Sequence, residues 1–124
     1  VTMEMGAGET QWLTVPIMNI ATSGSVFIPA PFDGALGRMK IATNGETLDV
    51  GEVHVNLAGV LVTGLSISLD QSGQGAGEVY STVATGANTV SEGDAIQVQW
   101  DGGASSQMHA TEVDCIVAIE VLPV

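Results

Sequence analysis

Short apolar segments that end at turn residues recur along the whole chain, and this pattern restricts the possible folds most. Sixteen glycines and four prolines interrupt the sequence. No window of about ten residues keeps apolar side chains at helical spacing without a Gly or Pro inside it. In the last third, residues 95–100 and 111–122 instead alternate along the chain, which places every second side chain on the same face of a strand. We therefore expect an all-β fold with little or no helix.

About eight strands are expected, because turn signals recur roughly every 8–12 residues, a spacing typical of antiparallel β-sandwiches. An immunoglobulin-like sandwich would show a Cys…Trp…Cys pattern, whereas Cys115 is the only cysteine in the chain. A jelly-roll-like sandwich is therefore favoured. The main expected strands span residues 12–20, 25–28, 36–43, 52–57, 60–69, 78–84, 95–100 and 111–122.

Local signals refine this outline. Pro16 cannot donate to a strand ladder, so the strand over residues 12–20 is expected at a sheet edge or at a bulge. Asn44-Gly45 is a strong hairpin signal, and residues 46–50 are expected to return along the strand over 36–43. Residues 1–10 show no clear periodicity and are expected to form an N-terminal arm. Residues 11–124 are expected to form a single domain.

The acidic balance of the chain excludes several classes of partner. Fourteen Asp and Glu residues stand against Arg38 and Lys40, for a formal net charge of −12. Binding to nucleic acid needs Lys and Arg to displace counterions from phosphates, and anionic membrane surfaces also attract basic segments. We therefore expect neither a nucleic-acid nor a membrane partner. The single cysteine permits no internal disulfide, which favours assembly in a reducing cytosol.

Residue types that can carry catalysis are present but are not grouped in the sequence. His54 lies in the middle of a strand and His109 in a polar loop, and both are interpreted as solvated. Cys115 lies on the apolar face of a strand, where a thiol is expected to be buried and inert. We therefore expect no enzymatic activity, no small-molecule substrate and no cofactor. The carboxylates are dispersed over turns and strand ends, at Asp33, Asp49, Asp70, Glu92, Asp94 and Asp101.

Metal and sugar sites are weakly indicated at most. Oxygen ligands in turns suit calcium, so an ion at Glu92 and Asp94, or at Asp101, stays an alternative, but the calcium-loop pattern is absent and no metal site is predicted. The glycine-rich residues 73–77 lack the lysine of a phosphate loop. Aromatic rings could stack on a sugar, but places in the core or a subunit interface are favoured for Trp12, Phe27, Phe32, Tyr80 and Trp100.

Arg38 and Lys40 are the only basic side chains, and they lie two residues apart, so they share a face of one strand. Two interpretations stay open. They pair with acids across the expected hairpin, such as Glu46 or Asp49, at a gain of about 0–1 kcal/mol for each exposed pair. Alternatively, they mark the place where the domain meets an acidic partner.

Two segments resemble structural proteins from the heads of tailed bacteriophages. Residues 89–106 read TVSEGDAIQVQWDGGASS and precede the aliphatic strand over 111–121. Residues 26–34 read VFIPAPFDG, a strand followed by a proline corner. The resemblance implies a small decoration, or cement, protein on the outer surface of a capsid, within the virion and assembled in the host cytoplasm. It also implies a homotrimer that clamps neighbouring major capsid subunits against the pressure of the packaged DNA.

Within this interpretation, two groups of residues are expected to make the contacts. The arm with Met3 and Met5, together with Trp12, Arg38 and Lys40, is expected to touch the major capsid protein. The half-apolar face of the last strand is the candidate subunit interface, with Ile116, Ala118 and Leu122. The alternatives are a carbohydrate-binding or adhesin module of a tail fibre or surface appendage, and a component of a bacterial surface or filament assembly.

Overall fold

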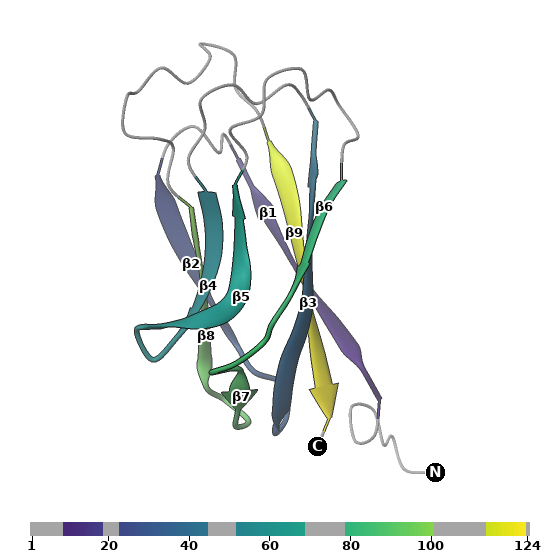
Figure 1. Cartoon of the computed structure of the whole chain (residues 1–124), viewed down its shortest axis with the longest axis vertical. Helices are drawn as coiled ribbons and strands as arrows, with labels where there is room; N and C mark the ends of the chain where they lie inside the picture. The colour runs from purple at the N-terminus through teal and green to yellow at the C-terminus, as the bar shows by residue number, and fades with distance from the viewer. Residues whose placement is uncertain (1–8, 19–22, 45–51, 69–78, 101–113, 124) are drawn as a thin grey trace.

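Two antiparallel sheets face each other across the core in the computed structural model (Figure 1), which describes residues 9–18, 23–44, 52–68, 79–100 and 114–123. The first sheet has the order β1-β9-β3-β6, and β7 also pairs with β3. The second sheet has the order β2-β8-β4-β5. The first sheet contains β1 (Gln11–Ile17), β3 (Gly34–Thr43), β6 (Val79–Val83), β7 (Thr89–Val90) and β9 (Cys115–Pro123). The second contains β2 (Gly24–Pro29), β4 (Glu52–Leu57), β5 (Val60–Ser68) and β8 (Ala95–Trp100).

The strand order is that of a jelly roll. The chain passes back and forth between the sheets, and the late strands β8 and β9 insert between strands formed earlier in the sequence. β6 pairs with residues 38–42 of β3 and β7 with residues 34–35, so these two short strands occupy the same side of β3. The nine strands of the described ranges therefore fill eight positions, and the predicted all-β, antiparallel sandwich is confirmed.

The core is aliphatic, as expected from a chain in which aromatic residues make up 4%. Alternation along each strand sends one side chain in two between the sheets. Phe32, Tyr80 and Trp100 are partly buried and pack against this core, whereas Trp12 and Phe27 are exposed. The buried side chains with no exposed surface are Leu36, Met39, Ile41, Val53, Val55, Val62, Leu65, Ile96, Val98, Val117, Ile119 and Val121.

The two segments with the phage-head resemblance meet at one end of the sandwich. Ala30, in the proline corner, exchanges two backbone hydrogen bonds with the 91–94 turn: its N–H donates to the carbonyl of Asp94, and its carbonyl accepts from the N–H of Gly93. The Asp33 carboxylate accepts a further hydrogen bond from the N–H of Glu92, at 2.8 Å. These bonds tie the start of β3 to the turn before β8, and so join the two sheets at this end.

The local signals had different outcomes. Pro16 lies in β1, an edge strand of the first sheet, which confirms one of its two expected positions. The prediction that residues 46–50 return along the strand over 36–43 is wrong as far as Ala42, because β9 and β6 already pair with both edges of β3 there. Residues 45–51 themselves lie outside the described residues. Among the residues described, no helix is long and apolar enough to cross a membrane.

Candidate functional site: the outer face of the first sheet

The outward side chains of the first sheet form rows that cross four strands. One row is apolar, with Pro16 on β1, Ile116 on β9, Ala42 on β3 and Val79 on β6 as successive partners. Because each strand alternates, the next outward row lies two residues further along. We call this surface the binding face; it comprises Trp12, Thr14, Pro16, Arg38, Lys40, Ala42, Val79, Ser81, Val83, Ile116, Ala118, Glu120 and Leu122.

The next row of the binding face is mixed. Thr14, Ala118, Lys40 and Ser81 are successive partners across the four strands. The Lys40 ammonium lies 5.4 Å from the centre of the Trp12 ring, on the other side of β9. The small side chain of Ala118 lies between their strands, and this leaves room for the contact. An exposed cation–π pair of this kind contributes about 0.5–1 kcal/mol.

Arg38 is anchored by its neighbours on both sides. Its backbone N–H donates to Glu120 Oε1 at 3.0 Å, and its Nη1 donates to Ser81 Oγ at 3.0 Å. A register shift in the β3–β9 pairing between Leu36 and Met39 accompanies this contact. With the described residues, neither Arg38 nor Lys40 forms a salt bridge. Both cations of an acidic chain are therefore displayed on one surface.

Apolar side chains on the binding face are unusually exposed for a sheet that faces water. The exposed fractions are 62% for Val79, 54% for Ile116, 43% for Val83 and 40% for Trp12. An antiparallel sheet in contact with water normally turns its polar residues outward. A hollow of about 400 Å³ continues the apolar row at one end, and Pro16, Ile116 and the exposed Met18 contribute to its lining. Contiguous apolar surface of this kind marks a site of protein contact.

The structure brings together the described members of the two groups of residues that the sequence assigns to separate contacts. Trp12 lies on β1, and Arg38 and Lys40 lie on β3, while the proposed subunit-interface residues lie on β9 between these strands. A partner that covers Arg38 and Lys40 must therefore also cover Ala118. The three β9 residues are Ile116, Ala118 and Leu122.

Sequence reasoning missed the contribution of β6 to this surface. Val79 and Val83 alternate with Tyr80 and Thr82, so the outward set was visible in the sequence. What was missing was the pairing of β6 with β3, which places Val83 opposite Arg38 and Ser81 opposite Lys40. That pairing joins strands about 40 residues apart and has no local signature.

Cys115 lies at the start of β9 on the buried face, as expected. Burial, with a smaller contribution from the nearby Asp114 carboxylate, raises the pKa of its thiol from 9.0 to about 12. Because the thiolate is the nucleophile, a raised pKa suppresses reactivity. Between pH 9 and pH 12 the unfolded chain loses the thiol proton before the folded chain does. The free energy of unfolding is therefore unaffected by this group below pH 9 and falls as the pH rises from 9 towards 12.

We expect native Cys115 to react with iodoacetamide at pH 8 roughly 100-fold more slowly than the urea-unfolded chain, or slower still. Both the smaller thiolate fraction and the loss of access act in this direction. Mass spectrometry of timed samples gives both rates. Similar rates in the two states would contradict the burial of this thiol, and Cys115→Ser provides the background without the reaction.

Other candidate polar residues have structural partners. The Asp94 carboxylate accepts a hydrogen bond from the Ser91 N–H at 2.8 Å and so caps its own turn. His54 is partly buried rather than solvated: Nε2 lies 3.1 Å from Gln99 Oε1, and Nδ1 lies 3.6 Å from Glu52 Oε1. Within the described ranges, no group of three or more His, Cys, Asp or Glu side chains could hold a metal ion.

Several residues singled out in the sequence lie outside the described residues, and their predictions stay as they were. They are the arm residues Met3 and Met5, the expected hairpin acids Glu46 and Asp49, the turn acids Asp70 and Asp101, His109, and the glycine-rich residues 73–77.

Comparison with known proteins finds similarity in structure but not in sequence. No protein-family model matches the chain. No curated protein matches it in sequence. Among solved structures, a chain of the capsid asymmetric unit of cyanophage Pam1 is similar, with a TM-score of 0.53, 14% sequence identity, and coverage of 94% of this chain and 84% of that chain. At this level of identity, the similarity shows a shared fold.

Proposed function

We propose that this chain is a non-enzymatic structural protein of a phage virion, which decorates the outer surface of the capsid and clamps neighbouring major capsid subunits. The binding face is the observation that carries the proposal, because it combines exposed apolar side chains with both cations of the chain. The fold shared with a chain of a phage capsid supports the virion setting. The phage-head resemblance of residues 89–106 points in the same direction.

The distribution of charge over the surface favours one face for docking. The chain has 14 acidic residues against two basic ones, for a net charge of −12, so its surface as a whole repels other acidic surfaces. The binding face carries Arg38 and Lys40 against a single carboxylate, Glu120, so an acidic protein surface meets complementary charge there. Trp12 and Arg38 are also of the residue types that dominate binding energy at protein interfaces. We therefore assign the whole binding face to the shell, including Ile116, Ala118 and Leu122.

A homotrimer is part of the proposal, as is a contact from the arm. Three linked copies bind three shell sites together, so that modest single contacts give high overall avidity. The described chain enters β1 at Gln11, beside Trp12 on the edge of the binding face. Residues 1–10 with Met3 and Met5 are proposed to extend the contact from this edge.

The test is binding to empty shells assembled from the major capsid protein of the same phage. We expect saturable binding at a fixed ratio to the shell subunits, and a native mass of about three times the 12.6 kDa chain. Sedimentation with quantitative gel analysis measures the ratio, and native mass spectrometry measures the mass. Absence of binding would contradict the proposal, and a handful of copies per shell would favour an appendage. Duplex DNA serves as the control that should not bind.

A further inference from the structure

The outer face of the second sheet has a different chemical character, because polar groups occupy its centre. In one row, Ser25, Gln99, His54 and Ser66 are successive partners across the four strands. In the neighbouring row, Phe27, Gln97, Asn56 and Leu61 follow one another. With strands about 4.8 Å apart, each row extends about 14 Å. We call these two rows the amide face.

The amides in these rows are held in place by one another. Asn56 Nδ2 donates to Gln97 Oε1 at 3.1 Å and to Gln99 Oε1 at 3.0 Å. Gln99 Oε1 also lies 3.1 Å from His54 Nε2. Asn56 is 9% exposed, so the bonds that fix both glutamines are largely shielded from water. Both glutamine oxygens point to Asn56, and their Nε2 groups have no hydrogen-bond partner among the described residues. The face therefore presents ordered donors.

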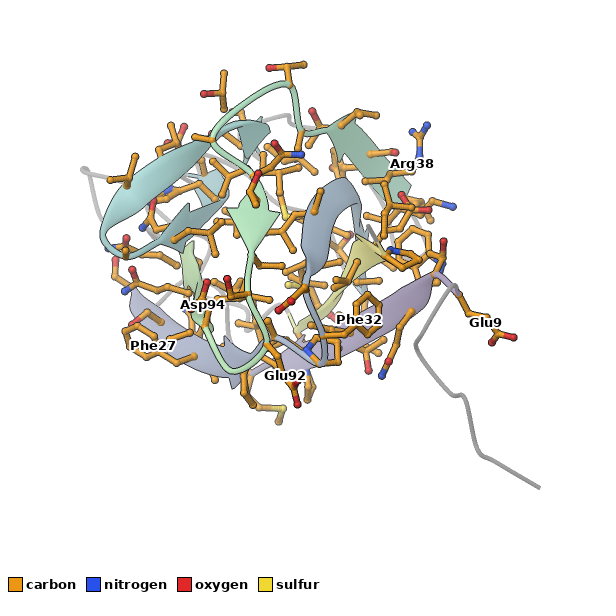
Figure 2. All side chains as sticks on the ribbon, turned by 90° about the horizontal axis from the view of Figure 1, so that it is seen from below. Glu9, Phe27, Phe32, Arg38, Glu92 and Asp94 are labelled. Atoms are coloured by element: carbon orange, nitrogen blue, oxygen red, sulfur yellow. The ribbon has the colours of Figure 1, made fainter. Side chains whose placement is uncertain are left out.

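An exposed aromatic ring adjoins these amides. Phe27 is 61% exposed and is the cross-strand partner of Gln97. Figure 2 shows it pointing away from the sandwich, on the side opposite Arg38. A hollow of about 410 Å³ lies beside the same rows, with Ser25, His54, Gln99 and Trp100 in its lining. Phe27 lies on the adjoining row and not in the lining of this hollow. A flat apolar ring beside orienting polar groups is the composition of a ligand site.

We propose that the amide face binds a neutral oligosaccharide. A sugar ring has an apolar C–H face that can stack on Phe27, and hydroxyl groups that both donate to and accept from amides and imidazole. Charge excludes acidic sugars and phosphates, since both basic residues lie on the other sheet and Glu52 lies 3.6 Å from His54. The length of the rows favours a chain of several sugars over a single ring.

The sugar site adds to the proposed function, but sugar binding and shell binding are separate measurements. If the binding face lies on the shell, the amide face on the opposite sheet points outward and can meet glycans on a cell surface (Figure 2). Sugar binding is measured on the purified protein without shells. Its failure would therefore leave capsid decoration untouched, and failure of shell binding would leave the sugar site untouched.

The experiment is isothermal titration of the purified protein with maltohexaose, cellohexaose, laminarihexaose and chitohexaose. We expect saturable binding of at least one of them, with a Kd of about 1 mM or tighter. Phe27→Ala and Gln99→Ala should each weaken that binding about 10-fold or more, because the first removes the stacking ring and the second removes a hydrogen-bonding amide. Phe27→Tyr keeps the ring and should retain binding. Circular dichroism and thermal melting establish that each variant is folded.

Trp12→Ala is the matched control, because it removes an exposed ring from the binding face and should leave sugar affinity unchanged. No saturable binding across the panel would overturn the proposal. Equal losses in Trp12→Ala and Phe27→Ala would also overturn it, because the site would then not be on the second sheet. Tighter binding of a hyaluronan hexasaccharide than of every neutral probe would contradict the preference for neutral sugars.

Discussion

Replacing Arg38 and Lys40 together by Glu is expected to weaken binding to capsid shells by about 100-fold or more. The change places carboxylates on the one surface that carries the basic residues of the chain, next to Glu120. Like charges brought together at an interface cost several kcal/mol. The folded state should change little, because both side chains are exposed and surface ion pairs contribute little. Sedimentation of shells with a titration of the variant measures the affinity.

A pair of matched variants separates local charge from net charge. Arg38→Gln with Lys40→Gln removes two positive charges from the binding face, and Ser25→Glu with Ser66→Glu adds two negative charges to exposed positions of the second sheet. Both variants lower the net charge by the same amount. Only the first should lose affinity by 10-fold or more. Equal losses would show that general repulsion, rather than this face, controls docking.

Gly64→Ala is expected to destabilise the fold by about 3 kcal/mol or more and to lower Tm by roughly 10 °C. Gly64 has a φ of +94°, a conformation that L side chains rarely adopt, and an added Cβ would overlap the Val83 carbonyl oxygen. That oxygen belongs to the backbone and cannot move aside as a side chain would. Urea unfolding followed by circular dichroism measures the free energy of unfolding.

Gly59→Ala is the control for this effect. Gly59 also has a positive φ, of +81°, but nothing lies within 4 Å of the position where its Cβ would be. The substitution therefore adds conformational strain alone, about 1–2 kcal/mol. If the two variants were equally destabilised, the close approach at Gly64 would be of no energetic importance.

Gly64 lies in β5 of the second sheet, at a place where hydrogen bonds join this strand to the first sheet. Thr82 Oγ1, in the first sheet, donates to the Gly64 carbonyl at 2.7 Å. The backbone of Thr63 exchanges hydrogen bonds with the segment after β6, donating to Gly86 at 3.0 Å and accepting from Thr85 at 2.7 Å. The sandwich is thereby closed along the β5–β6 side, and substitutions at this corner disturb both layers together.

Strands were predictable from the sequence where alternation is strict, and their partners were not. The inward positions of Met39 and Ile41 and the outward positions of Arg38 and Lys40 follow from period-two alternation alone. The return strand predicted after Asn44-Gly45 has no edge of β3 to pair with at residues 38–42, because β6 and β9 occupy both edges there, and a local turn preference competes with pairing to distant strands. Local propensity contains no information about that competition.

The binding face was predictable in its parts but not as a whole. The sequence placed Ile116 and Arg38 on outward faces of their own strands, yet it could not show that β9 lies beside β3. Phe27 was harder still, because Val26, Phe27 and Ile28 are all apolar and alternation cannot tell which of them faces outward. Pairing with β8 resolves this, since Phe27 lies opposite the outward Gln97.

The position of β9 has a consequence for how the protein is made. The last strand of the described chain lies between β1 and β3, and it pairs with β1 from Gln11 to Ile17. During translation β1 therefore lacks this hydrogen-bonding neighbour until residues 115–123 have been synthesised. Pairing across such sequence distances makes folding slow, on the order of milliseconds to seconds. The outer face formed by β1, β9, β3 and β6 is therefore complete only after β9 has been synthesised.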